Sequence, residues 1–229
     1  MTLTGFLLCA KGTEEAAHQE LLLLKSKPAK RGKGFVLFEA KTVDQIAEVA
    51  YRSLTATHVG IYLGSTNTVT TPESLPKSCD LKLLSGWVKG TTSKTVCERS
   101  GTHDFESKEV EAAFGETLLQ AGAKIQLDDP EIILFVAIDG QNAIWGLDLC
   151  GNNLGKRSYK VYNHPSALRG NLLSSVLFLT DVQKKQIVLD PFCKEGSILI
   201  EAALFFTQKS PRFFEKESLL FSRSPAYKD

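Results

Sequence analysis

The 229-residue sequence contains no apolar run close to the ~18 residues that a membrane-spanning helix needs. Its five cysteines are widely spaced and odd in number, which argues against a disulfide framework, and no Cys-x-x-Cys pair or clustered histidines suggest a metal site. The N-terminal segment, residues 4–10, lacks the basic start of a signal peptide and is typical of a strand. These absences predict a soluble cytoplasmic protein without a metal, a disulfide or a membrane partner.

The charges almost balance, with 27 Lys and Arg against 26 Asp and Glu and a formal net charge of +1. Such a balance does not by itself indicate a nucleic-acid-binding protein, so any contact with RNA must come from a local patch. The densest patch is the run from Lys25 to Lys33, which includes Lys30 and Arg31. Two interpretations stay open for it, namely a solvated loop between strands and a loop that contacts phosphates.

The first 65 residues show strand and helix patterns in short alternation. Strands are predicted at residues 5–10, 35–39 and 57–63, and helices begin after Thr13 and Thr42. The resulting β-α-β-α-β order with short connections is typical of a ferredoxin-like α+β unit. The Thr-, Ser- and Pro-rich stretch from Thr66 to Pro76 predicts the first domain boundary.

The middle of the chain, residues 66–150, predicts a second α/β domain. A short helix is expected at residues 81–87, a strand at 92–97 and a longer helix at 107–121. Two apolar strands, 132–138 and 142–149, are joined by Asp139-Gly140, which is a hairpin signal. The polar stretch 151–164, with a basic cluster, is predicted to be a linker.

The last part, residues 165–229, predicts a helix at 165–180, a strand at 186–190 and a helix at 195–207. The turn between the strand and the second helix reads Asp-Pro-Phe-Cys-Lys-Glu-Gly-Ser from Asp190 to Ser197. An acidic residue and a tight turn at the carboxyl end of a strand mark the place where open α/β sheets bind ligands. A purely structural strand–helix turn is the alternative interpretation. Cys193 is expected to be a small buried residue and not a nucleophile.

This turn resembles the S-adenosylmethionine-binding motif of RNA methyltransferases, which read Asp-Pro-x-Cys-Gly-Ser-Gly-Thr. Further upstream, residues 99–105 read Arg-x-Gly-x-His-x-Phe, Asp128-Asp129-Pro130 follows, and residues 151–159 read Gly-x-x-Leu-x-x-Arg-x-Tyr. Together these motifs resemble the THUMP domain, and the linker that follows it, in THUMP-containing RNA guanine-N2 methyltransferases. A fifth motif, Asn163-His164-Pro165-Ser166-Ala167-Leu168-Arg169-Gly170-Asn171-Leu172, follows this linker motif. The resemblance covers essentially the whole chain, and five short motifs in the family's order are more specific than any one of them.

The resemblance implies a ferredoxin-like unit at 1–65, a THUMP domain at 66–150, a linker at 151–164 and the start of a Rossmann-like methyltransferase domain at 165–229. It also implies structured RNA, above all tRNA, as the partner and S-adenosylmethionine as the cofactor. The implied cofactor-binding residues are Asp190, Pro191, Cys193, Gly196 and Ser197. The implied RNA-binding residues are Arg99, His103, Phe105, Lys30, Arg31, Lys156, Arg157 and Lys160.

The alternative interpretations of these residues are structural: a core position for Phe105, a turn position for His103 and an ordinary basic linker around Lys156. The chain also departs from the family, because it has no Asn-Pro-Pro or Asp-Pro-Pro acceptor motif, and Lys194 and Glu195 replace Gly-Ser. The nearest substitute, Ser224-Pro225-Ala226-Tyr227, follows the first motif too soon. No catalytic residue is therefore assigned. Two hypotheses remain. The first is a guanine-N2 methyltransferase, completed either by a separate C-terminal partner or within a longer protein from which this chain was cut, and the second is an RNA-binding module without chemistry.

Overall fold

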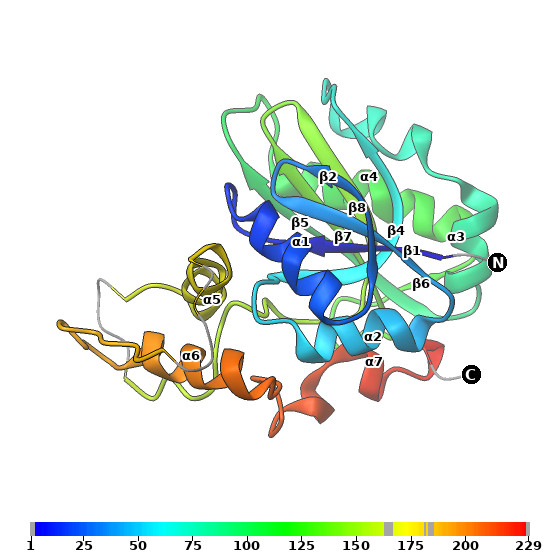
Figure 1. Ribbon diagram of the computed structural model, residues 1–229. Coiled ribbons are helices and arrows are strands. Elements are labelled where there is room, and N and C mark those ends of the chain that lie inside the picture. The colour runs from blue at the N-terminus through cyan, green and yellow to red at the C-terminus, as the bar shows by residue number, and fades with distance from the viewer. Residues whose placement is uncertain (1–2, 163–166, 181, 183–185, 228–229) are drawn as a thin grey trace. The chain divides into compact units, whose positions relative to one another are not determined.

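A computed structural model describes residues 3–162, 167–180, 182 and 186–227 (Figure 1). The chain divides into two compact units, one formed by Met1–Gly60 with Asn152–Leu219 and the other by Ile61–Gly151 with Leu220–Asp229. Each unit therefore combines two segments that are distant in the sequence. No helix in the described ranges is both long and apolar enough to cross a membrane.

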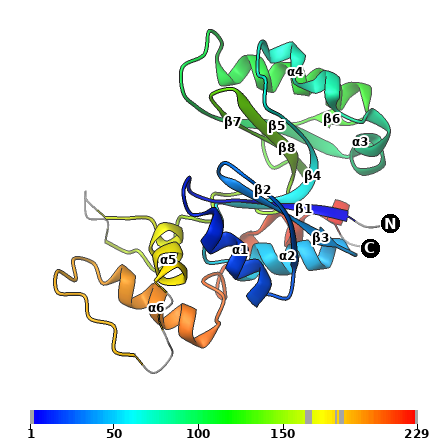
Figure 2. The same ribbon diagram turned by 45° about the horizontal axis from the view of Figure 1, so that its top comes forward.

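The first unit begins with the element order β-α-β-β-α-β. Its elements are β1 (Leu3–Leu8), α1 (Glu14–Leu23), β2 (Lys27–Gly32), β3 (Phe35–Ala40), α2 (Val43–Arg52) and the start of β4 (His58–Thr66). The strands are hydrogen-bonded in the order β2-β3-β1-β4, and β3 runs antiparallel to both β1 and β2. Helices α1 and α2 lie on one face of these strands (Figure 2).

Local sequence signals explain both helices of this unit. Thr42 caps α2, because its hydroxyl accepts a hydrogen bond from the Gln45 backbone N–H at 3.4 Å. The buried side of α2 carries Ile46 and Ala50, and α1 buries Ala17 and Leu21 at the same helical spacing. The predicted helices after Thr13 and Thr42 are both present.

Strand β2 was not predicted from the sequence, whose basic run indicated a loop. Residues Lys27–Gly32 pair with β3, with a register shift between Pro28 and Lys30. The strand lies at the end of the strand order and is exposed along most of its length. Lysines and a proline are common on such edge strands because they discourage pairing with another chain, so they mask the alternation that signals a strand.

The second unit contains the rest of β4 and four further strands. Its other elements are α3 (Leu81–Val88), β5 (Thr92–Ser100), α4 (Ser107–Gln120), β6 (Lys124–Ile125), β7 (Ile132–Asp139), β8 (Asn142–Asp148) and α7 (Leu220–Arg223). The strand order is β4-β8-β7-β5-β6, with β5 parallel to β6 and β7. The predicted antiparallel hairpin of β7 and β8 is confirmed, and α4 packs against β5.

The C-terminal part of the first unit contains α5 (Gly170–Leu179) and α6 (Ser197–Thr207), which pack against each other. The helix predicted from residue 165 begins only at Gly170, and residues 163–166 lie outside the described residues. The strand predicted at 186–190 does not form, and this prediction is wrong for the described chain. A strand needs a neighbour to satisfy its backbone, and no strand of the described chain lies beside these residues.

Candidate functional site

The turn before α6 is stabilised by Asp190. Its Oδ1 accepts hydrogen bonds from the backbone N–H groups of Phe192 at 3.1 Å and Cys193 at 2.9 Å. Short Asp side chains commonly cap turns in this way. Pro191, which stands between Asp190 and Phe192 in the chain, is exposed. In the described structure, Asp190 therefore shapes the turn that follows it.

The backbone of the turn is left-handed at three positions. Cys193 has φ +46°, Lys194 has φ +41°, and Gly196, which caps α6, has φ +71°. Left-handed backbone costs residues with a Cβ about 1–2 kcal/mol, so it favours glycine. No atom lies within 4 Å of the place where a Cβ on Gly196 would stand, so the backbone there is open to close approach. Cys193 is exposed, which corrects the expectation of a buried thiol.

Two side chains connect this turn to the predicted linker. Glu195 accepts a hydrogen bond from the Ser197 hydroxyl at 2.8 Å and forms an ion pair with Lys160 at 2.5 Å. Lys160 also donates to the Leu168 carbonyl at 2.6 Å, and its side chain is largely buried. A hollow of about 230 Å³ lies here, lined by Tyr159, Lys160, Val161, Tyr162, Glu195 and Ser197. The linker and the turn thus share one small cavity.

A buried carboxylate, Glu201, connects α6 to the same linker. It accepts hydrogen bonds from Arg157 Nε at 2.7 Å, from the Tyr159 hydroxyl at 2.5 Å and from the Ser174 hydroxyl. The Arg157 and Glu201 side chains are 1% and 0% exposed. Burial, and then the charge and hydrogen bond of Glu201, raise the pKa of Tyr159 far above its ordinary value, so Tyr159 stays a donor. These bonds hold α6 at a defined position relative to the linker.

Arg157 was predicted to contact RNA, and its burial contradicts that prediction. Besides Glu201, its guanidinium donates to the carbonyls of Leu154 at 2.5 Å and Leu54 at 2.7 Å. Gly170 lies against this pair, because a Cβ there would overlap Glu201 and stand 2.7 Å from Arg157 Nε. The linker motif of Gly, Leu, Arg and Tyr therefore has a structural role in this chain, because its Arg157 and Tyr159 hold α6 through Glu201.

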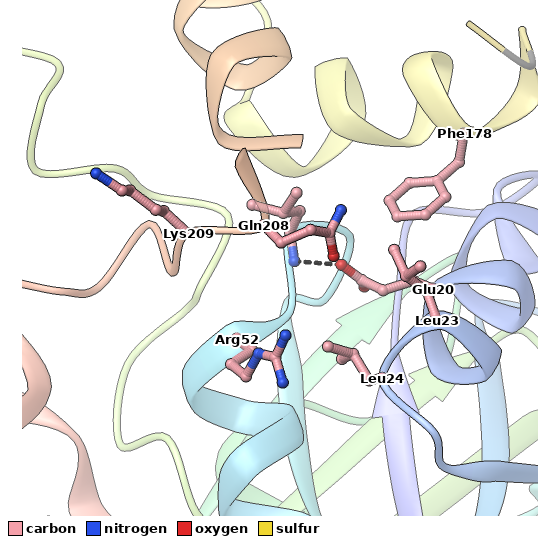
Figure 3. Close-up of a pocket in the computed structure, with 8 residues that line it drawn as sticks. Glu20, Leu23, Leu24, Arg52, Phe178, Gln208 and Lys209 are labelled. Carbon is pink, nitrogen blue, oxygen red and sulfur yellow. Dashed lines mark hydrogen bonds between the residues drawn. The ribbon is translucent and has the colours of Figure 1, made fainter. Parts of the chain in front are cut away.

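A second buried carboxylate, Glu20 on α1, organises the loop after α2. It accepts from the Ser53 hydroxyl at 2.6 Å, the Leu54 N–H at 2.6 Å and the Thr55 hydroxyl at 2.6 Å. Figure 3 shows the Glu20 carboxylate facing this loop, with its bond to the Leu54 N–H drawn as a dashed line. The cavity beside it measures about 10 Å³, which is too small for a cofactor. Glu20 therefore serves the fold and not ligand binding.

One signal in the sequence indicates the role of Glu201. Glu201 is the only charged residue of α6, whose other residues are apolar apart from Ser197 and Thr207. A charge in an apolar helix is costly to bury unless it is paired, so it indicates a partner. The identity of the partner depends on the fold and cannot be read from local spacing.

Arg99, His103 and Phe105 are brought together in the second unit. Arg99 Nη1 lies 3.2 Å from His103 Nδ1, and the Arg99 guanidinium carbon lies 5.7 Å from the centre of the Phe105 ring. His103 Nε2 lies 2.8 Å from the Gly140 carbonyl. Arginine can only donate, so His103 accepts at Nδ1 and its Nε2 donates to the Gly140 carbonyl. Phe105 is buried, and the cluster joins the turn after β5 to the β7–β8 hairpin.

The basic residues of β2 are largely compensated by acidic neighbours. Arg31 forms an ion pair with Glu15, and Lys27 pairs with Glu39 at 2.9 Å. Lys30 is exposed, and its side chain has no partner among the described residues. The same holds for Lys156, which borders two hollows of about 300 and 360 Å³. Lys30 and Lys156 are thus available to a phosphate, besides the half-buried Arg99.

The segment Ser224–Tyr227 has a structural environment. Tyr227 is buried, and its hydroxyl donates to the Asp148 carbonyl at 3.3 Å. A tyrosine held in this way has no face free for stacking on a base.

The turn suits only one end of S-adenosylmethionine. The open backbone at Gly196 and the paired charge of Glu195 allow the methionine end to approach. The ribose is usually held by an acid at the end of a neighbouring strand, and the described residues place no strand beside 186–190. No group of three or more His, Cys, Asp or Glu side chains that could hold a metal occurs among the described residues.

Comparison with known proteins places this turn in a methyltransferase context. A protein-family model described as RMKL-like, methyltransferase domain, matches residues 157–226. The chain is 32% identical over 144 residues to a tRNA (guanine(6)-N2)-methyltransferase of Methanocaldococcus jannaschii, covering 59% of this chain and 38% of the relative. It is 36% identical to the Thermus thermophilus enzyme of the same name, covering 52% and 35%.

A third relative extends over most of the chain. The ribosomal RNA large subunit methyltransferase K/L of Acinetobacter baylyi is 27% identical, covering 91% of this chain and 30% of the relative. The chain thus spans roughly a third of the length of these curated relatives, which are tRNA and rRNA methyltransferases.

Solved structures show the same fold. A possible methylase from Clostridium difficile 630 gives a TM-score of 0.77 at 18% identity, covering 99% of this chain and 61% of that chain. SMU.472, a putative methyltransferase complexed with SAH, gives 0.75 at 20%, covering 98% and 60%. TrmN from Thermus thermophilus gives 0.60 at 25%, covering 90% and 62%. The chain therefore has an α/β methyltransferase-like fold and is similar to RNA methyltransferases.

Proposed function

We propose that this chain is the RNA-binding and cofactor-turn part of an S-adenosylmethionine-dependent guanine-N2 methyltransferase that acts on tRNA. The observation that carries the proposal is the match of residues 157–226 to a methyltransferase domain. That segment contains the Asp190–Ser197 turn and the Arg157–Glu201 pair that anchors the following helix. The tRNA (guanine(6)-N2)-methyltransferases among the relatives support tRNA as the substrate class.

The domain organisation that we propose is a ferredoxin-like unit at 1–65, a THUMP RNA-binding domain at 66–150, a linker at 151–164 and a partial Rossmann-like domain at 165–229. The β-α-β-β-α-β order and the strand order β2-β3-β1-β4 support the first assignment. Two of these limits lie near divisions between the compact units, at Gly60 and Gly151, whereas residues 152–219 cluster with the first unit. The linker motif packs with the first unit through Arg157 and Leu54.

RNA contacts are proposed at Lys30, Lys156 and Arg99, with backbone phosphates as the ligands. Arg99 is held by His103 and the Phe105 ring, so its guanidinium is pre-oriented. Asp190, Pro191, Cys193, Gly196 and Ser197 are proposed to line the methionine end of the cofactor. When bound, S-adenosylmethionine would supply the methyl group, and this turn would hold and orient it.

A second candidate function is RNA binding without chemistry. Two observations favour it for this chain alone: the acceptor motif is missing from the sequence, and Tyr227 of the nearest substitute is buried. Transfer of a labelled methyl group to tRNA by residues 1–229 alone would exclude this second candidate.

Salt dependence of tRNA binding tests the RNA-binding part of the proposal. With roughly three phosphate contacts, affinity for a structured tRNA should fall by about one to two orders of magnitude between ~50 and ~200 mM salt. A gel-shift titration at both salt concentrations measures this, with an unstructured RNA of equal length as the control. Absence of binding, or binding that ignores salt, would remove the basis of the proposal.

A further inference from the structure

A hollow of about 360 Å³ lies between the linker and the start of α5, and both of these segments belong to the first unit. The described residues that line it are Gly155, Lys156, Arg157, Lys160, Ala167, Leu168 and Arg169. Four of these seven residues are basic, and none is acidic. Pockets for small molecules are usually lined by apolar and aromatic side chains, so this lining indicates an anionic ligand.

Two of the four cations are already neutralised within the protein. Arg157 donates to Glu201 at 2.7 Å and to two backbone carbonyls, and its side chain is 1% exposed. Lys160 pairs with Glu195 at 2.5 Å and donates to the Leu168 carbonyl at 2.6 Å. Because these bonds fix part of the wall, the hollow is formed before a ligand arrives, which lowers the entropic cost of binding.

The other two cations, Lys156 and Arg169, carry charge that the protein does not neutralise. Both are exposed, and the side chain of neither has a partner among the described residues. Both border the same hollow. Clefts lined by charges of one sign concentrate the electrostatic potential and attract counter-ions. The two unpaired charges therefore make this hollow a site for an anion.

We propose that this hollow, named the basic hollow, binds one phosphate group of an RNA, which Lys156 and Arg169 hold together. Arginine donates to two phosphate oxygens from its planar guanidinium, and lysine adds a point charge. The inference rests on the proposed function, because it adds Arg169 and a defined site to the RNA contact proposed at Lys156. The ligand is a single phosphate because both unpaired cations border one hollow.

The second hollow that Lys156 borders suits a phosphate less well. It measures about 300 Å³, and its lining includes Glu215. The Glu215 side chain has no cationic partner among the residues that the structure describes. A phosphate in that hollow would be repelled by the carboxylate, since like charges at close range disfavour each other. The basic hollow has no such acid in its described lining.

The first measurement needs no RNA. Inorganic phosphate is titrated into residues 1–229 at constant ionic strength, and the backbone amide resonances are followed by NMR. We expect saturable shifts at millimolar phosphate for Gly155 and Arg169, and their loss in Arg169→Gln. Lys209→Gln removes an exposed lysine of the same unit that does not line the hollow, so this control should leave the titration unchanged. Amides that do not respond to phosphate would overturn the proposal.

The second measurement tests whether Lys156 and Arg169 share one phosphate. Gel-shift titrations with a structured tRNA compare Lys156→Gln, Arg169→Gln and the double variant. Each single substitution should weaken binding by about tenfold and reduce the salt slope by about one unit, and the double substitution should do no more. A loss of about a hundredfold with a slope reduced by about two units would show two separate contacts and overturn the shared site. Thermal melting checks that each variant is folded.

The same titrations identify the phosphate and separate the two proposals. A tRNA with a 5′-phosphate is compared with the dephosphorylated tRNA: a loss of affinity that Arg169→Gln does not increase assigns the terminal phosphate, and equal affinities assign a backbone phosphate. Undiminished tRNA binding by Arg169→Gln would overturn the basic hollow and leave the proposed function intact. Binding of inorganic phosphate without any binding of tRNA would contradict the proposed function, and with it RNA as the source of the phosphate.

Discussion

Gly170 shows at the scale of a single residue how the buried ion pair constrains the sequence. A Cβ at Gly170 would overlap Glu201 and lie 2.7 Å from Arg157 Nε, and both side chains are almost fully buried. Gly170→Ala should therefore destabilise the protein by about 1–3 kcal/mol, the usual cost of overpacking. Urea unfolding followed by circular dichroism measures the change.

Gly115, inside α4, is the matched control because no atom lies within 4 Å of its added Cβ. Gly115→Ala should stabilise the protein by about 0.5–1 kcal/mol through a better helix residue. Equal effects of the two substitutions would contradict the tight packing inferred around Glu201.

The buried thiol of Cys9 predicts how stability depends on pH. Burial raises the pKa of Cys9 from its ordinary 9.0 to about 12, an effect only partly offset by a hydrogen bond with Thr13. Below pH 9 the thiol is protonated in both states and adds no pH dependence. Above pH 9 the unfolded chain loses the proton while the folded chain keeps it, so the free energy of unfolding falls as pH rises toward 12.

The expected slope from Cys9 is up to about 1.4 kcal/mol per pH unit. Denaturation at a series of pH values from 8.5 to about 11 measures it. Cys9→Ala should reduce the slope, whereas Cys193→Ala, which removes an exposed thiol, should not. An unchanged slope in Cys9→Ala would show that other groups set the alkaline limit.

At the scale of elements, the structure confirms features that local signals specify. Helices α1 and α2 and the hairpin of β7 and β8 were predicted because caps, helical spacing and Asp139-Gly140 lie within a few residues of one another. Strand β2 was missed because charged residues of an edge strand hide its period. The segment 186–190 has the composition of a strand, but a strand forms only beside a partner.

In the candidate site, too, the local features were predictable from the sequence and the long-range contacts were not. The Asp190–Ser197 turn was located from its sequence, because acid, proline and glycine fix the local backbone. The role of Arg157 could not be predicted from the sequence, because its partner Glu201 lies 44 residues away and only the fold brings the two residues together. A basic residue that pairs in the interior looks the same in sequence as one that contacts phosphate.

Substitution of Arg157 and of its neighbour Lys156 distinguishes a buried structural cation from a cation that contacts phosphate. Arg157→Ala leaves Glu201 buried without its cation and should cost about 3–5 kcal/mol of stability. Lys156→Ala removes an exposed cation, so it should leave stability within about 0.5 kcal/mol and flatten the salt slope of tRNA binding by about one unit. Chemical denaturation and gel-shift titrations below the melting temperature give both quantities. A reduced salt slope from Arg157→Ala in still-folded protein would revive it as a phosphate contact.

At the scale of the whole molecule, several basic residues of β2 and of the linker are paired within the protein. Arg31, Lys27, Arg157 and Lys160 all bind carboxylates of the same chain. With a formal net charge of +1, long-range attraction to RNA is weak, and binding depends on a few unpaired cations such as Lys156. This distribution explains why single Lys substitutions should be visible in the salt slope.

The whole chain also determines how well it holds S-adenosylmethionine. The turn fits the methionine end, but the described structure places no second strand beside it to hold the ribose, and Lys194 occupies a left-handed position that favours glycine. We expect residues 1–229 alone to bind S-adenosylmethionine more weakly than about 1 mM, roughly 4 kcal/mol short of a micromolar site. Isothermal titration calorimetry tests this, and saturable micromolar binding would contradict it.

The double substitution Lys194→Gly and Glu195→Ser should not restore tight binding, because it relieves backbone strain without supplying the ribose contacts. A large gain in affinity from that variant would show that the turn residues, and not the absent strand, limit the site.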